Sequence, residues 1–323
     1  MKTLIKWPDI QLFNNVYKFI KINPNNWFSD IVDKTKSTSV IYRSKCKLHG
    51  MNMAIQVYDN NVICQSRDTI LSLSNDLKGF AKFVSERDFS LAKDHIIYGE
   101  WVGPGIQSDV AVSNIPNKVF AVFAASPLND LNKLIIEPDE LSNLVSNIKD
   151  VYVIPWYNEL IEINWSNSEE EIGHTVMMIN EWVKKVEEND PWVFETFNIK
   201  GTGEGLVFYP ISHPGREMFS NFTFKAKGNK HQNIAKAAPA QLHAEKANSI
   251  NEFVNLVVTE ARLNQGLALI GNDKKFTGKF VQWVKDDVKK EAKDEMEASG
   301  LTFDIVQKEI ENKARTWFLK GIN

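Results

Sequence analysis

The chain has 323 residues, of which 43% are hydrophobic and 24% charged, a composition typical of a globular protein with one large domain or two. Every apolar run is interrupted by polar residues before it could cross a bilayer, and the basic N-terminus lacks the apolar core of a signal peptide. We therefore expect a cytoplasmic protein without a membrane span. The formal net charge of −3 counts against a nucleic-acid binder, unless the lysines and arginines gather in one groove.

The first two thirds of the chain shows a mixture of strand and helix patterns. Alternating or continuous apolar residues predict strands over 53–58, 95–98 and 151–154. Apolar residues at helical spacing predict helices over 77–84 and, after a capping box, over 168–186.

The last third of the chain has only helical patterns. Apolar stripes at helical spacing cover 250–261, 280–288 and 303–318, and Ser249 begins a capping box before the first of them.

A segment of different composition separates these two parts of the chain. Lys236–Ala240 resembles a linker, because it is rich in alanine and contains a proline. We therefore expect one domain at residues 1–240 and a helical domain at residues 241–323.

Lys47-Leu48-His49-Gly50 is the sharpest local motif. A lysine that loses its proton is a nucleophile, and Gly50 would let a ligand approach the backbone closely. Taken alone, this tetrapeptide is more often a surface lysine before a turn.

Two acidic motifs follow. Glu100 comes at the end of the strand predicted from 95, where a carboxylate could hold a ribose hydroxyl or a metal ion; the Gly103–Gly105 segment after it is by itself a turn. Glu204 stands among glycines, yet the sequence contains no P-loop and no dinucleotide-binding fingerprint. A serine-hydrolase elbow and a zinc-spaced His/Cys cluster are also missing from the sequence.

Residues 222–227 alternate as a strand does. This pattern would place the three apolar residues, Phe222 among them, on one face and Lys225 and Lys227 together on the other. Two neighbouring ammonium groups suit a polyphosphate, although lysines also protect an edge strand from aggregation.

The four motifs occur in the order Lys-x-His-Gly, Gly-Glu, Glu-Gly-x-Val and Lys-x-Lys. This ordered series resembles the motifs of covalent nucleotidyltransferases, the superfamily of ATP-dependent ligases and mRNA capping enzymes. His49 stands where DNA ligases and capping enzymes usually have Asp, and residues 99–107 are similar to the second RNA ligase of T-even phages and its relatives. The resemblance extends from Lys47 through most of the chain to its end.

The resemblance implies an α+β fold, in which a mixed, largely antiparallel nucleotidyltransferase domain of the ATP-grasp-like ligase kind precedes a small all-α domain that engages RNA. It implies an ATP- and Mg²⁺-dependent RNA ligase for RNA repair that carries AMP on Lys47 and joins 3′-hydroxyl and 5′-phosphate RNA ends without an obligate protein partner. Glu204 would also lie near the metal, Glu100 would bind the ribose and Phe123 would stack on adenine. The implied catalytic residues are Lys47, Glu204, Lys225 and Lys227. The implied nucleotide-binding residues are Cys46, Leu48, His49, Asn52, Arg67, Glu100 and Phe123.

Two positions depart from the family pattern: Cys46 replaces a glutamate, and Ala124 follows Phe123 where an acid often stands. Alternatives within the superfamily are a capping-type guanylyltransferase and a DNA ligase. His49 and the lack of an evident C-terminal β-barrel argue against both. A further alternative is a non-catalytic protein that binds RNA ends, which predicts eroded motifs, whereas these motifs are intact.

Overall fold

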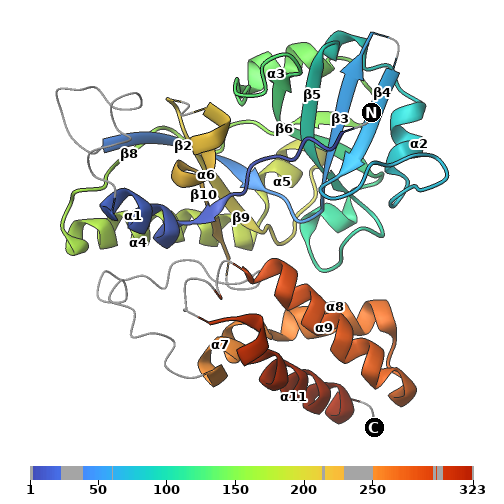
Figure 1. The fold of residues 1–323 in the computed structure, drawn as a ribbon, viewed down its shortest axis with the longest axis vertical. Coiled ribbons are helices and arrows are strands. Elements are labelled where there is room, and N and C mark those ends of the chain that lie inside the picture. Colours follow the sequence, from blue (N-terminus) through green and yellow to red (C-terminus); the bar gives the residue numbers. More distant parts are fainter. Residues whose placement is uncertain are drawn as a thin grey trace.

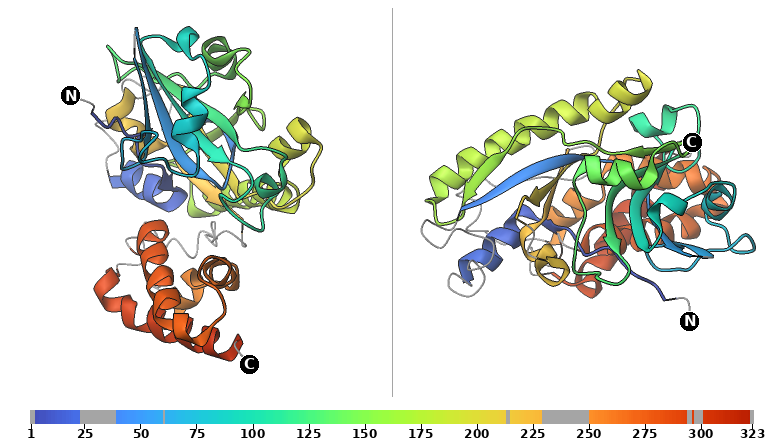
Figure 2. Two further views of the ribbon diagram at one scale, coloured as in Figure 1. Left: turned by 90° about the vertical axis from the view of Figure 1, so that its right-hand side faces the viewer. Right: turned by 90° about the horizontal axis from the view of Figure 1, so that it is seen from above.

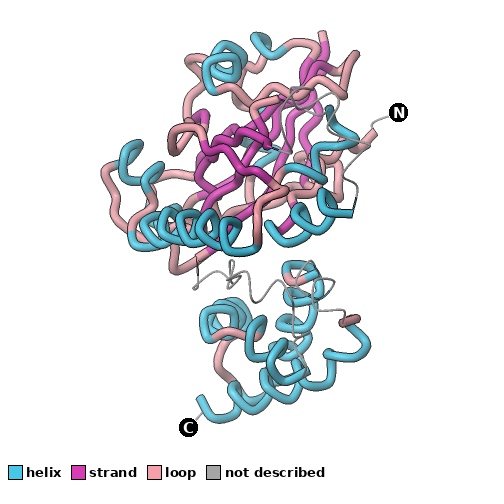
Figure 3. Tube along the Cα trace, turned by 90° about the vertical axis from the view of Figure 1, so that its left-hand side faces the viewer, coloured by secondary structure: helices cyan, strands magenta, loops and turns pink. Residues whose placement is uncertain are grey.

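The computed structural model describes residues 3–22, 39–59, 61–212, 215–228, 250–293, 296 and 301–321. Two five-stranded sheets make up the sheet body, residues 3–228, and helices alone make up the described part of the helical tail, residues 250–321 (Figure 1). Figure 3 shows all the strands in the sheet body and only helices and loops in the tail. The predicted α+β fold with an all-helical C-terminal region is therefore confirmed. None of the described helices is long and apolar enough to cross a membrane.

Sheet A carries the first lysine motif and the last. Its strands lie in the order β1 (Gln11–Leu12), β10 (Phe224–Lys227), β9 (Gly205–Pro210), β2 (Ser39–Lys47) and β8 (Ile161–Asn164). Every pairing in it is antiparallel except that of β1 with β10. Helices α1 (Phe13–Ile22) and α4 (Glu169–Glu188) bury apolar residues against one face of this sheet, and Figure 2 shows α4 running along it. The predicted capping box of α4 is present, since Ser168 and Glu171 accept hydrogen bonds from each other's backbone N–H.

Sheet B carries the Gly-Glu motif. Its strands lie in the order β4 (Asn61–Ser66), β3 (Met51–Tyr58), β5 (His95–Val102), β6 (Val119–Pro127) and β7 (Val151–Val153). Only the β6–β7 pairing is parallel. Helices α2 (Phe80–Ser85) and α3 (Pro138–Val145) cover its outer face. The strands and helices predicted in this part of the chain are therefore present.

An apolar cluster between the two sheets joins their inner faces. It draws on β2 and β9 of sheet A, on β3, β5 and β6 of sheet B, and on α5 (Pro191–Phe197) and α6 (Gly215–Phe222). One local prediction here is wrong: Phe222 ends α6 instead of opening a strand, and β10 begins only at Phe224. Phe222 is nevertheless fully buried in the same cluster as Phe224, so its apolar character reflects packing and not strand alternation.

The helical tail has a hydrophobic core of its own. Its helices are α7 (Ile250–Val257), α8 (Glu260–Ile270), α9 (Thr277–Glu291) and α11 (Phe303–Gly321), and all four contribute to that core. The stripe predicted over 250–261 as one helix is interrupted, because Thr259 caps a new helix by accepting the N–H of Arg262. The linker Lys236–Ala240, the boundary near residue 240 and the capping residue Ser249 lie outside the described residues.

The N-terminal segment, residues 3–12, connects the two sheets. Ile5 exchanges two backbone hydrogen bonds with the side chain of Gln65 on sheet B, at 3.2 and 3.1 Å. Gln11 and Leu12 then pair with β10 of sheet A. Figure 1 shows this segment crossing from β3 and β4 to β10, so it holds the two sheets at one edge of the gap between them.

Both cysteines are buried thiols that are not joined in a disulfide. Cys46 is on β2 in the cluster between the sheets, and Cys64 is on β4 in the cluster under sheet B. Each sheet therefore has one buried thiol.

Candidate active site

Strand register brings two lysines of sheet A together. Lys47 ends β2 and pairs with Gly205 on β9, and Gly205 pairs on its other side with Lys227 of β10. Residues directly opposite each other in a sheet project from the same face, so Lys47 and Lys227 flank Gly205 on one face. Gly205 has φ 151°, and a Cβ there would collide with the carbonyl of Ala226. Only glycine fits this position between the two lysines.

Glu204 joins the two lysines. Its Oε2 lies 2.8 Å from Lys47 Nζ, and its Oε1 lies 3.2 Å from Lys227 Nζ. The Glu204 side chain is only 3% exposed, and His49 Nδ1 is 3.5 Å from the same Oε2. Residues that are 157 positions apart in the sequence, Lys47 and Glu204, are thus in direct contact.

The charges around Glu204 keep it ionised. Burial alone would raise its pKa, but Lys47, Lys227 and His49 hold that pKa well below the ordinary value. Lys47 is 23% exposed. A ligand can therefore reach its amine while the carboxylate behind it stays buried.

Glu100 approaches the lysine motif from sheet B. Its Oε1 accepts the N–H of Gly50 at 3.2 Å. A Cβ at position 50 would lie 2.9 Å from Cγ of Glu100 and would also collide with the Trp101 carbonyl. Gly50 thus allows the turn after Lys47 to lie against β5. Asn52 pairs in register with Glu100 across β3 and β5, which places it beside the same turn.

Glu100 has the opposite electrostatic environment to Glu204. Burial raises its pKa to about 8, Lys47 lowers it, and the negative charge of Glu204 raises it. Near neutral pH the site therefore holds one ionised carboxylate beside two lysines and one carboxyl group that retains a proton.

The apolar residues implied in nucleotide binding lie in the cluster between the sheets. Cys46, Leu48 and Phe123 all belong to it and are 3–9% exposed. Burial raises the pKa of the Cys46 thiol well above its ordinary value, so this side chain is a neutral wall beside Lys47. The structure brings Phe123 to the same cluster as Val207 of β9, which supplies an aromatic face and an aliphatic face in one apolar region.

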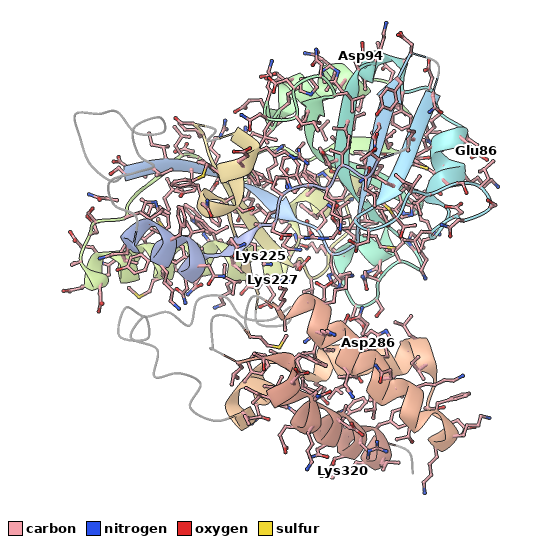
Figure 4. All side chains as sticks on the ribbon, viewed as in Figure 1. Glu86, Asp94, Lys225, Lys227, Asp286 and Lys320 are labelled. Atoms are coloured by element: carbon pink, nitrogen blue, oxygen red, sulfur yellow. The ribbon has the colours of Figure 1, made fainter. Side chains whose placement is uncertain are left out.

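Two implied residues lie farther from this centre. Lys225 shares a face of β10 with Lys227 and pairs with Val207, two residues along β9 from Gly205. Arg67 follows β4, is half exposed and forms an ion pair with Asp9 of the N-terminal segment. Figure 4 shows Lys225 and Lys227 at the edge of the sheet body that faces the helical tail.

Lys45 is a functional candidate that sequence reasoning missed. The residue is 1% exposed, and its ammonium donates to the carbonyl of Phe123 at 2.9 Å and lies 4.8 Å from the centre of the Trp156 ring. Burial lowers its pKa to about 7, with Glu137 opposing that shift. In the sequence, Lys45 is only a second lysine two residues before Lys47. No local pattern indicates that its side chain is buried.

Contacts from the helical tail are also unmarked in the sequence. Gln265 of α8 donates to the side chain of Gln107 at 2.6 Å, and Gln107 lies 3.5 Å from the Gly50 carbonyl. Glu291 ends α9; burial would raise its pKa, but Lys227, Lys290 and Lys47 lower it to about 2. The tail therefore places an amide and a carboxylate near the lysine site.

Among the described residues, no group of three His, Cys, Asp or Glu side chains is arranged to hold a metal ion by itself. Mg²⁺ is commonly held by one or two carboxylates together with phosphate oxygens of a substrate. Glu204 and Glu100 could supply those one or two carboxylates.

Comparisons with known proteins give one family match. The model of the family described as RNA ligase matches residues 44–227, which contain all four motifs. No curated protein matches the chain. Among solved structures, a Naegleria gruberi RNA ligase with PPi is 19% identical with a TM-score of 0.43, covering 71% of this chain and 57% of that one. A substituted form of that ligase with ATP and Mn is 17% identical with a TM-score of 0.43 over the same shares. The chain thus spans a little over half the length of these structures.

Proposed function

Because this chain belongs to the RNA ligase family, we propose that it is an ATP-dependent RNA ligase that forms a covalent AMP intermediate on Lys47. One observation carries the proposal: Glu204 contacts both Lys47 and Lys227, at 2.8 and 3.2 Å, across the register that Gly205 fixes. A nucleophilic lysine beside a second buried cation is the arrangement that transfer of a nucleotide to an amine requires.

The base and the sugar occupy different parts of the site in this proposal. Adenine enters the apolar cluster, where Phe123 stacks on it and Leu48 and Cys46 border it. The Glu100 carboxyl group faces the ribose, and Asn52 lies beside it in register. Arg67 contacts the nucleotide or the RNA 5′-phosphate. Lys225 and Lys227 contact the phosphates, since they project together from β10.

The reaction proceeds in three displacements at phosphorus. The Lys47 amine, after losing its proton, attacks the α-phosphate of ATP, and pyrophosphate leaves. An oxygen of the RNA 5′-phosphate then attacks the lysine-bound AMP, which breaks the phosphorus–nitrogen bond and frees Lys47. Finally, a 3′-hydroxyl attacks the activated 5′-phosphate and AMP leaves, so a phosphodiester replaces the break.

Glu204 and Lys227 prepare the first displacement. In the free protein Glu204 is the counter-ion of Lys47, at 2.8 Å. Lys227 contacts the other oxygen of Glu204, which holds its ammonium beside Lys47. Phosphates that bind Lys227 and Lys225 therefore lie next to the nucleophile. Glu204, with Glu100 near it, would hold Mg²⁺, which supplies neutralisation of phosphate charge when it is bound.

The division of the chain gives each part a task. We assign adenylylation to residues 1–240 and RNA engagement to the helical domain at 241–323. The contact of Gln265 with Gln107 supports this assignment, because it brings α8 to the edge of the lysine site. RNA with 3′-hydroxyl and 5′-phosphate ends is the proposed substrate.

Covalent labelling tests the proposal. The full-length protein is incubated with Mg²⁺ and α-labelled ATP or GTP, then denatured, and the label retained on the protein is measured. We expect labelling by ATP in preference to GTP, and mass spectrometry should place AMP on Lys47. No label from either nucleotide, or AMP on another lysine, would contradict the proposal. Preference for GTP would instead favour a capping-type guanylyltransferase.

A further inference from the structure

Trp7 of the N-terminal segment lies against the residue proposed to stack on adenine. Its ring centre is 5.5 Å from that of Phe123, in an edge-on arrangement, and 4.9 and 5.0 Å from those of Tyr98 and Phe219. Trp7 is 6% exposed and belongs to the cluster between the sheets that also contains Val207. A base that stacks on Phe123 in this cluster would therefore have the indole as a neighbour.

The indole N–H of Trp7 lacks an acceptor. Among the described residues, the buried Nε1 of Trp7 has no hydrogen-bond partner. By contrast, the indoles of Trp101 and Trp156 donate to a backbone carbonyl and to a carboxylate. A buried donor without an acceptor is unfavourable, and buried donors are nearly always satisfied in a folded protein. An acceptor on a bound molecule would satisfy this one.

The backbone on both sides of Trp7 is held in place. Thr3 and Ile5 are bonded to glutamine side chains of sheet B, with Gln56 Nε2 donating to the Thr3 carbonyl at 2.8 Å. Lys6 pairs with Asp68 at 2.6 Å, and its carbonyl accepts from Arg216. After Trp7, Gln11 and Leu12 pair with β10. Because the segment is held at both ends, the indole has a fixed position relative to Phe123 and can select a ligand by geometry.

We propose that Trp7 is a purine-binding residue, which donates its indole N–H to a ring nitrogen of the purine bound against Phe123. This inference rests on the proposed nucleotidyl transfer. Adenine offers acceptors at N1, N3 and N7, whereas the N1 of guanine carries a hydrogen and cannot accept. A donor directed at N1 would favour ATP, and a donor directed at N3 or N7 would hold either purine.

Purine analogues that lack one ring nitrogen identify the acceptor. Self-adenylylation of the full-length protein is measured with ATP and with its 1-deaza, 3-deaza and 7-deaza analogues, for the wild type and for Trp7→Phe. Trp7→Phe keeps an aromatic ring and removes only the donor and part of the ring area. We expect one analogue to raise the KM of the wild type by about tenfold, the effect of one lost hydrogen bond. Trp7→Phe should raise the KM for ATP by a similar factor and should not discriminate further against that analogue, while kcat changes little.

Trp165→Phe is the matched control. Trp165 is also a buried tryptophan, but it packs with Tyr42 and Phe13 on the outer face of sheet A. Its replacement should leave every KM unchanged. A Trp7→Phe protein with the KM of the wild type would overturn the inference, and so would a wild type that uses all three analogues as well as ATP. The wild-type series needs no variant, so it decides the question even if Trp7→Phe folds poorly. If the wild type takes no label from any nucleotide, the proposed function itself fails.

Discussion

The sheet body and the helical tail differ in what they bury. The sheet body buries Lys45, Glu204 and Lys227, and the last two of these contact each other at 3.2 Å. In the described part of the tail the core is apolar, and the buried charged residue there is Arg262, which is neutralised by Asp287 at 2.6 Å. Burying a charge is costly unless it is paired. The tail pairs its buried charge between α8 and α9, as a packing element does. The sheet body keeps an excess of lysines around one carboxylate, as an anion-binding site does.

The largest expected effect follows from removing the nucleophile. Lys47→Ala should reduce covalent labelling by ATP to background, because it removes the proposed nucleophile. The other amine against Glu204, that of Lys227 at 3.2 Å, is less exposed than that of Lys47. Lys47→Arg is the matched control: it keeps the positive charge beside Glu204 but cannot act as the nucleophile. Both variants should keep the far-UV circular dichroism spectrum of the wild type. A labelled Lys47→Ala protein would mean that the reactive lysine lies elsewhere.

Removing the helical tail should separate the two tasks. A chain that ends near residue 240 should still become adenylylated but should fail to seal nicked or single-stranded 5′-phosphorylated RNA. The reason is that the four motifs precede residue 228, while α8 contributes Gln265 at the edge of the site. Gel assays of label on protein and of sealed RNA measure the two activities. Sealing at the rate of the full chain would show that the tail is only a packing element.

The two lysines of β10 should give a smaller loss, confined to chemistry. Lys225→Ala and Lys227→Ala should each slow adenylylation. The expected loss of transition-state stabilisation is about 2–4 kcal/mol, the usual cost of losing a charged contact in a closed site. Lys285→Ala, in the tail, is the control: Lys285 is also ion-paired, with Glu311 at 3.7 Å. It should leave adenylylation unchanged. A Lys227→Ala protein that labels normally would reduce that lysine to a counter-ion for Glu204.

The smallest expected effect is on stability. Burial raises the pKa of Glu100 to about 8 from an ordinary value of 4.5. Between those values the folded protein holds a proton that the unfolded chain has lost, so the free energy of unfolding falls as pH rises through this window. Glu100→Gln mimics the protonated form and can still accept the Gly50 N–H. It should therefore raise Tm by roughly 3 °C at pH 8.5, with little change at pH 5, while adenylylation weakens. A difference in Tm that shrinks with rising pH would contradict this account.

Local sequence patterns predicted β3, β5 and β7, the helices α2, α4, α9 and α11, and the four motifs, because each depends on residues close together in the chain. The capping box of α4 and the stripes of α9 and α11 are of this kind. The register Lys47–Gly205–Lys227 is not, since strand pairing over such a separation depends on the whole sheet. The ordered motifs could indicate that these residues meet but not that Glu204 bridges two amines.

The remaining differences between the sequence-based predictions and the structure have two kinds of physical cause. Phe222 and the break at Thr259 show packing and capping overriding a simple periodicity, since apolar residues continue across both boundaries. Lys45, Trp7 and Gln265 acquire their positions only when distant elements pack together, and a lysine, a tryptophan or a glutamine has no local signature of such a contact. The sequence gives the order of the motif residues along the chain, and the structure shows which other residues contact them.

The two buried thiols make the opening of the sheet body measurable. A thiol reagent attacks the ionised form of an exposed cysteine, and burial keeps Cys46 protonated as well as inaccessible. Cys46 reports on the cluster between the sheets and Cys64 on the cluster under sheet B, so the modification rate at each site measures how often that cluster is exposed. Alkylation of the wild-type protein followed by peptide mass spectrometry would therefore resolve whether ATP slows the opening of both clusters or only of the one between the sheets.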